Sequence, residues 1–126
     1  GASMNTFSFT GRLTRDPERR ETKSGKILSV VTLAVSRDNT RNEADFIPLT
    51  AWGNLSERMQ SYGSKGRLLE IEGYVRVKPF SAGPGGHTNP GIQFVAEKFK
   101  FLDSPKGNTE IMVPECDPID VDEFFG

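Results

Sequence analysis

The chain contains 126 residues with a mass of 13.9 kDa, and 35% of them are apolar. This length predicts one domain with at most a tail, and no run of about 18 apolar residues is present to predict a membrane helix. The single cysteine, Cys116, cannot form an internal disulfide. Because a charged and then apolar leader is also lacking, we expect a cytoplasmic protein. Residues 1–3, which precede Met4, are interpreted as a remnant of expression cloning.

The formal net charge of −1 conceals an uneven distribution of charge. Residues 1–106 contain 16 Lys+Arg and 11 Asp+Glu, a balance of +5, whereas residues 107–126 contain six acidic and no basic residues. A cationic body favours binding to a polyanion, and an anionic tail would repel the same polyanion. The sequence therefore predicts two parts with opposite electrostatic preferences.

Two strands are predicted in the amino-terminal third of the chain. The first is Phe7–Leu13, in which apolar residues alternate with polar ones. Pro17 and the Ser24-Gly25 pair interrupt the next segment, which is expected to be a loop, or a loop with a short hairpin. Its five basic and three acidic residues either contact phosphate or form an ordinary solvated surface. The second strand, Ile27–Arg37, is rich in β-branched residues.

The third predicted strand, Ala44–Trp52, carries two aromatic residues on one face. Phe46 and Trp52 are an even number of residues apart, so in an extended strand both rings point to the same side. The other face presents Ile47, Leu49 and Ala51, which suit a core. Exposed rings among basic residues would form a stacking platform for unpaired bases; the alternative is that this face is also buried.

A short helix and two further strands complete the predicted fold. Asn54–Tyr62 has helical spacing of Leu55, Met59 and Tyr62, with Asn54 expected as the N-cap and Gly63 as a left-handed C-cap. The fourth strand is Arg67–Lys78, with Leu69, Ile71, Val75 and Val77 facing inward and Gly73 predicting a bend. The fifth is Ile92–Leu102, with Val95, Phe99 and Phe101 on one face.

These elements predict an all-β fold with one short helix. Five strands with a helix between the third and the fourth is the order of an OB-fold barrel. We expect the barrel to occupy residues 4–103. Residues 104–126 contain three prolines and several acids without periodicity, which predicts a disordered acidic tail with an apolar end.

Several motifs in this order resemble the bacterial single-stranded DNA-binding protein (SSB) family. They are N-T-F-S-F-T-G-R-L-T-R-D-P-E from Asn5, L-A-V-S-R from Leu33, A-D-F-I-P-L-T-A-W-G from Ala44 and E-I-E-G-Y-V-R-V from Glu70. The resemblance implies an OB-fold that assembles as a homotetramer and binds single-stranded DNA, without strong sequence preference, during replication, recombination or repair. It also implies a bacterial, nucleoid-associated protein.

The resemblance assigns base stacking to Phe46, Trp52 and Phe80. A further aromatic that the family usually has falls near Asn39, where this chain has none, which implies a smaller binding site or a lower affinity. We predict phosphate contacts from four basic residues at outward positions or strand ends, for any of which a plain solvated role is the alternative. They are Arg12, Arg37, Arg76 and Lys78.

The acidic end of the chain resembles the segment through which the family binds replication and repair proteins. Here the partner-binding residues are predicted to be Asp120, Asp122, Glu123, Phe124 and Phe125. The family's proline is missing, and Gly126 follows the two rings. We also expect the tail to compete with DNA for the cationic body.

No catalytic residue, metal site or cofactor is expected. His87 is the only histidine and lies in a Gly- and Pro-rich segment, and no G-K-[ST] follows the glycines to form a phosphate-binding loop. Two other classes of function remain open. In one, the barrel is only the scaffold of an interaction adaptor that acts through its acidic tail; in the other, it is an RNA- or oligosaccharide-binding OB module.

Overall fold

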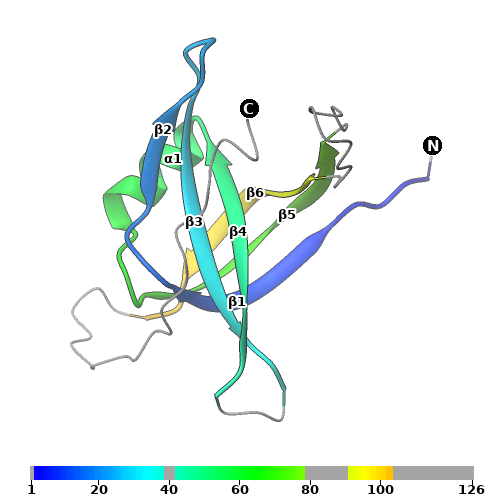
Figure 1. Cartoon of the computed structure of the whole chain (residues 1–126), viewed down its shortest axis with the longest axis vertical. Coiled ribbons are helices and arrows are strands. Elements are labelled where there is room, and N and C mark those ends of the chain that lie inside the picture. The colour runs from blue at the N-terminus through cyan, green and yellow to red at the C-terminus, as the bar shows by residue number, and fades with distance from the viewer. Residues whose placement is uncertain (1, 39–41, 79–90, 104–126) are drawn as a thin grey trace, which may run out of the picture.

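The computed structural model describes residues 2–38, 42–78 and 91–103 of the chain (Figure 1). It confirms an all-β fold with one helix, and the boundaries agree with the predicted ones to within one or two residues. Within the described ranges, no helix has the length and apolar composition that crossing a membrane requires. The elements are β1 (Phe7–Leu13), β2 (Glu18–Glu21), β3 (Ile27–Ser36), β4 (Ala44–Trp52), α1 (Asn54–Tyr62), β5 (Leu68–Lys78) and β6 (Gly91–Phe101).

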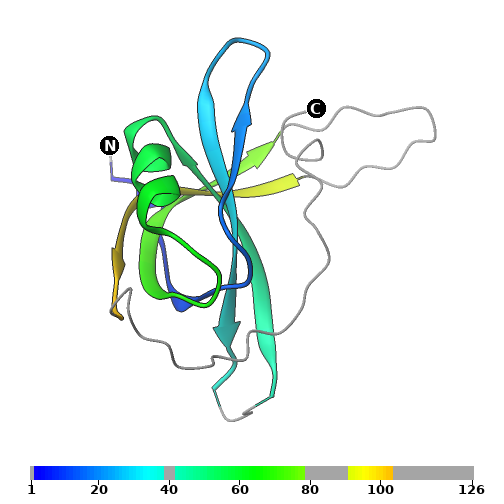
Figure 2. The same ribbon diagram turned by 90° about the vertical axis from the view of Figure 1, so that its left-hand side faces the viewer.

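Five strands close into a barrel, as the OB-fold prediction requires. The sheet order is β1-β5-β6-β4-β3-β2, and an additional pairing between β1 and β3 joins the ends of the five-stranded part. All pairings are antiparallel except that between β4 and β6. The remaining strand, β2, forms a hairpin with β3 that projects from the barrel (Figure 2). Of the two forms predicted for the segment after β1, a loop or a loop with a short hairpin, the second is confirmed.

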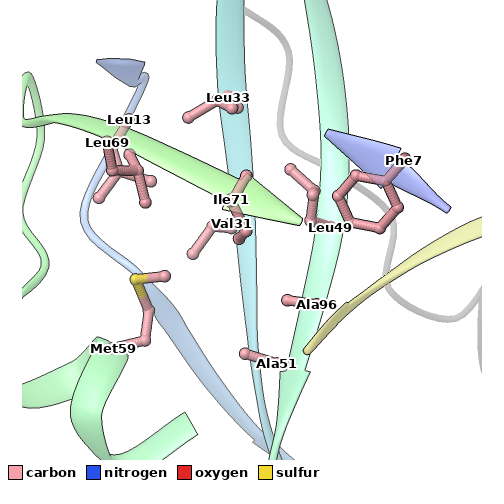
Figure 3. Close-up of a cluster of buried hydrophobic side chains, with 10 residues drawn as sticks. All are labelled: Phe7, Leu13, Val31, Leu33, Leu49, Ala51, Met59, Leu69, Ile71 and Ala96. Atoms are coloured by element: carbon pink, nitrogen blue, oxygen red, sulfur yellow. The ribbon is translucent and has the colours of Figure 1, made fainter. Parts of the chain in front are cut away.

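Every strand of the closed sheet contributes side chains to the core inside the barrel. Leu49 and Ala51 of β4 are fully buried, with Ile47 packed beside them, so the predicted inward row of that strand is confirmed. Met59 of α1 points between the strands from one end of the barrel (Figure 3). The buried cluster consists of Phe7, Leu13, Val31, Leu33, Leu49, Ala51, Met59, Leu69, Ile71 and Ala96.

A β-bulge between β5 and β6 changes which side chains of β6 face the core. The register shifts at Glu72/Gly73, so Gly73 is paired with Ala96. A Cβ on Gly73 would overlap the carbonyl oxygen of Val95, which is why only glycine fits this bend. The predicted bend is therefore confirmed at this position.

Because of the bulge, the prediction that Val95 shares a face with Phe99 and Phe101 is wrong. Ala96 lies in the core with Phe99 and Phe101 packed against it, and Phe94 is also on the core side. Val95 instead faces outward, because the inserted residue reverses the alternation between the two halves of the strand.

The end of β5 also departs from the prediction. The predicted inward row of β5 is wrong at Val77, because 58% of its surface is exposed. Its partner in β6, Ile92, is 51% exposed. Both residues lie in the part of the β5–β6 ladder that pairs with neither β1 nor β4, so they are outside the closed barrel. Figure 1 shows β5 and β6 running side by side to this end.

The caps of α1 differ from those predicted, although its two ends do not. Gly53, with φ 60°, is the N-cap in place of Asn54, and no side chain caps the helix. Gly63 is extended, with φ −82° and ψ 142°, and is not left-handed. Its lack of a side chain is still required, because a Cβ there would lie 2.6 Å from the oxygen of Met59.

One residue of the predicted apolar stripe of α1 is exposed. Met59 is buried and Leu55 packs against the core, whereas Tyr62 is 63% exposed. The helix meets β3 through polar groups as well: the hydroxyls of Ser29 and Ser56 are 2.7 Å apart and both side chains are buried. The buried side of α1 is therefore formed by Ser56 and Met59, and Tyr62 lies outside it.

Candidate nucleic-acid interface

Phe46 and Trp52 lie on the outer face of β4, opposite Leu49 and Ala51. Phe46 is 39% exposed, and Trp52 is half-buried. The predicted shared face is therefore confirmed. Trp52 also packs against an outer apolar pair, Leu28 and Val30.

The indole of Trp52 is held in place from two sides. Its Nε1–H donates a hydrogen bond to the Thr50 hydroxyl, at 3.1 Å. Its packing on Leu28 and Val30 covers part of the ring. The ring thus combines both expected roles of this face, because it is partly packed and partly available at the surface.

Strand pairing places an arginine beside each of these aromatic positions. Arg12 pairs with Ala34, which pairs with Phe46. Likewise Arg20 pairs with Leu28, which pairs with Trp52. Since directly opposed residues project from the same face, each arginine shares a face with one ring, and their backbones are two strands, or about 10 Å, apart.

Both arginines also make contacts within the protein. Nη1 of Arg12 donates a hydrogen bond to the carbonyl oxygen of Gly66, at 3.1 Å. Nε of Arg20 lies 3.4 Å from Oε1 of Glu18, a solvent-exposed ion pair. Such pairs contribute little in water, so they leave the arginine free to exchange partners.

A groove of about 360 Å³ opens beside Trp52 on the same face. The β2–β3 turn forms one wall, β5 forms the other, and β6 contributes the floor between β4 and β5. Its lining residues are Thr22, Ser24, Lys26, Trp52, Tyr74, Arg76, Gln93 and Val95.

The β2–β3 turn is fixed by its own hydrogen bonds, which positions Lys26. The Lys26 N–H donates to the Thr22 hydroxyl at 3.0 Å, and the Thr22 N–H donates to the Lys26 carbonyl at 2.8 Å. Gly25 supplies the left-handed residue that the turn needs, with φ 87°. The threonine, serine and glycine of the segment therefore build a defined wall for the groove.

The charge of the groove is positive. Lys26 stands on one wall and Arg76 on the other, and none of the described residues that line the groove is acidic. The guanidinium carbon of Arg76 lies 5.9 Å from the centre of the Tyr74 ring, within the range of a cation–π contact. Aromatic faces beside cations are the combination that binds bases and phosphates together.

Comparison with known proteins agrees with this arrangement. The model of the single-strand binding protein family matches residues 4–102, which include every described strand of the barrel. The chain belongs to this family. The resemblance inferred from the sequence motifs is thereby confirmed.

Proteins named single-stranded DNA-binding protein in several bacteria are similar to this chain. One, from Clostridium tetani, is 38% identical over 104 residues, covering 79% of this chain and 71% of the relative. Single-stranded DNA-binding protein 2 of Streptococcus agalactiae is 36% identical over 104 residues, with 79% and 78% covered. The relative from Thermotoga maritima is 33% identical over 126 residues, with 90% and 89% covered.

Arg37 lies apart from the groove, among acidic groups. Its Nη2 is 2.8 Å from Oδ1 of Asp45, and its Nη1 is 3.6 Å from Oε2 of Glu43. The hydrogen bond that the guanidinium donates to the Asp45 carboxylate, followed by the negative charge of that carboxylate, raises the pKa of Arg37. Two carboxylates beside one arginine leave this end of the β3–β4 hairpin with a local negative balance.

The other residues predicted for the family's DNA site are placed unevenly. Arg76 lines the groove, whereas Lys78 lies at the end of β5, opposite Gly91, and is not part of the lining. Phe80, the position near Asn39 and the partner-binding residues of the tail lie outside the described residues. Where the structure describes the chain, no group of three or more His, Cys, Asp or Glu side chains is arranged to hold a metal ion.

Sequence reasoning missed several residues of the groove. Tyr74 had a usable signal, since the alternation of β5 placed it on the outward face beside Arg76. Lys26 was hidden in a mixed run of charges that solvated surfaces also contain. Val95 could not have been found, because the bulge that turns it outward depends on pairing with another strand.

Proposed function

We propose that this protein binds single-stranded DNA without strong sequence preference, during replication, recombination or repair. One observation carries the proposal: the groove beside Trp52 joins aromatic rings and cations, and its described lining residues include no acid. Stacking on an aromatic ring contributes about 1–3 kcal/mol per base and tolerates any base. Arg and Lys neutralise phosphates and release counterions, so affinity falls with salt.

The proposed path of the strand runs along the outer face of β4. From Trp52 to Phe46, β4 spans six residues, or roughly 20 Å at about 3.3 Å per residue. Bases stack on the rings at the two ends of this path. Arg12 and Arg76 contact the phosphates, and Arg37, Lys78 and Phe80 extend the proposed interface beyond it.

Preference for a single strand follows from the same groups. In a duplex the faces of the bases are covered by their neighbours, so an aromatic side chain cannot stack on them without unpairing the helix. A single strand exposes these faces at no such cost. Phosphate contacts alone would bind either form, which means that the rings carry the preference.

The test is the anisotropy of a labelled oligo-dT titrated with protein, with duplex DNA and RNA of equal length as competitors. Oligo-dT should bind more tightly than the duplex. The variant Trp52→Ala should weaken binding about 5- to 150-fold, the equivalent of ~1–3 kcal/mol. Stronger competition by RNA would favour the RNA-binding alternative. DNA affinity that is unchanged when Trp52 and Phe46 are replaced would favour the adaptor.

We further propose a homotetramer in which residues 104–126 form an acidic tail that binds replication and repair proteins. The tail residues are Asp120, Asp122, Glu123, Phe124 and Phe125, and the protein would associate with the bacterial nucleoid. This part rests on the resemblance of the chain to the family. Sedimentation velocity of the intact chain tests the assembly, because a monomer or a dimer would contradict it.

A further inference from the structure

The hollow between Trp52 and Tyr74 is a defined subsite within the groove. We propose that it receives one unpaired base and that Tyr74 supplies the second stacking surface. This inference rests on the proposed binding of single-stranded DNA, and it adds a residue that neither the sequence motifs nor the comparisons assign.

The order of the strands places the two rings on opposite sides of β6. Val95 pairs with Tyr74 in β5 and with Thr50 in β4, two residues before Trp52. The strands that carry the rings are therefore about 10 Å apart at the backbone. One stacked base occupies about 3.4 Å, as in B-DNA, so two rings need only roughly 7 Å to hold a base between them.

The floor of the subsite is low because of the bulge at Gly73. Opposite Tyr74 stands Val95, a short side chain that is only 8% exposed. The neighbouring residue with a ring, Phe94, points to the core side. Without the register shift the alternation of β6 would be reversed on this face, so the bulge is what keeps the space between the rings open.

Two cationic side chains lie beside the subsite, and one of them contacts the Tyr74 ring. Arg76, two residues further along β5, projects from the same face, and its guanidinium carbon is 5.9 Å from the centre of the tyrosine ring. Lys26 stands on the opposite wall, on the turn fixed by Thr22. A nucleotide whose base lies between the rings would thus have a cation near the phosphate on each side.

The first experiment compares Tyr74→Ala with Tyr74→Phe by oligo-dT anisotropy. Loss of the ring should weaken binding roughly 5- to 150-fold, whereas Tyr74→Phe, which keeps the ring, should restore most of the affinity. The matched control is Tyr62→Ala on α1, an exposed tyrosine that does not line the groove, and this variant should bind as the unaltered chain does.

Salt dependence separates stacking from charge. The logarithmic salt slope should be unchanged in Tyr74→Ala, since no phosphate contact is lost. In Arg76→Gln it should fall by about 0.7, the value for one phosphate contact to a single strand. A reduced slope in Tyr74→Ala would mean that the tyrosine acts only by placing Arg76, and would overturn the subsite.

A second variant keeps the inference falsifiable if Tyr74→Ala does not fold. In Trp52→Phe combined with Tyr74→Trp, the single indole reports directly from position 74. Oligo-dT should quench its fluorescence; binding without quenching would overturn the subsite. If the unaltered chain binds no oligo-dT, the proposed function itself fails, whereas binding by the unaltered chain and equally by Tyr74→Ala removes only the subsite.

Discussion

Two exposed arginines predicted to contact phosphate differ in their surroundings. Arg76 lines the positive groove beside the Tyr74 ring. Arg37 lies within 3.6 Å of two carboxylates, those of Asp45 and Glu43. A phosphate that approaches Arg37 must displace or oppose these acids, so the same residue type contributes less there. Sequence position could not reveal this difference, because the pairing of β3 and β4 creates it.

This contrast predicts unequal effects of the two substitutions on DNA binding. Arg76→Gln should lower the salt slope by about 0.7, and Arg37→Gln should lower it by clearly less. Asp45→Asn should raise affinity at low salt, because it removes a charge that repels phosphate. Measured slopes for oligo-dT decide the matter, and an Arg37→Gln effect as large as that of Arg76→Gln would show that the ion pair opens on binding.

Gly73 is the residue on which the shape of the groove depends most. A Cβ at this position would overlap the Val95 carbonyl oxygen, a backbone atom that cannot rotate away. Gly73→Ala should therefore lower the free energy of unfolding by about 1–3 kcal/mol or more, measured by urea denaturation. Gly25→Asn is the control: its surroundings are open, and asparagine tolerates the left-handed backbone there. Equal stabilities of the two variants would contradict the close approach.

At the scale of elements, alternation predicted most of the barrel but not its irregular points. The inward row of β4 and the order of strands and helix followed from spacing alone, because one buried face constrains every second residue. The prediction for the face of Val95 is wrong, because a bulge arises from the pairing of two strands and leaves no pattern in the sequence of one of them. Propensity favours Asn54 as the N-cap, but Gly53, the single residue between β4 and α1, takes this position with φ 60°.

The helix closes the barrel mainly through one side chain. Met59 is fully buried in the core and belongs to the same cluster as Leu13 and Leu69. Met59→Ala should lower the free energy of unfolding by about 2–5 kcal/mol, while Tyr62→Ala should change it by less than about 0.5 kcal/mol. Chemical denaturation measures both. Because α1 does not line the groove, oligo-dT affinity of folded Met59→Ala should be retained; a large loss would show that the helix shapes the DNA site.

At the scale of the whole molecule, the groove lies beside the first half of β6, and residue 103, the last described residue, follows the other end of that strand. Val95 is in the groove, and eight residues later Asp103 is held by Arg67, whose Nε lies 3.2 Å from its carboxylate. The six residue steps of β6 from Val95 to Phe101 span roughly 20 Å, and Asp103 follows two residues after the end of the strand. The sequence predicts a flexible tail after residue 103, and about 16 residues of such a chain, up to the acidic cluster, would span roughly 20–24 Å on average. A tail of this kind would therefore be just long enough to reach the groove.

Deleting residues 107–126 should consequently tighten binding of oligo-dT several-fold at low salt. The deletion removes six acidic residues and no basic ones, and the difference from the intact chain should vanish at high salt, where charges are screened. A chain of full length with these acids changed to amides serves as the control for length. If the intact and shortened chains bind alike at low salt, the tail does not compete for the groove.

The most direct test of the central claim uses Trp52, the only tryptophan of the chain. Its fluorescence is followed while the protein is titrated with oligo-dT at low and at high salt, with duplex DNA as control. The account predicts strong quenching by oligo-dT, weak quenching by the duplex and a rise in the apparent Kd with salt. Binding of oligo-dT that leaves the fluorescence unchanged would contradict it, because the strand would then bypass the groove beside Trp52.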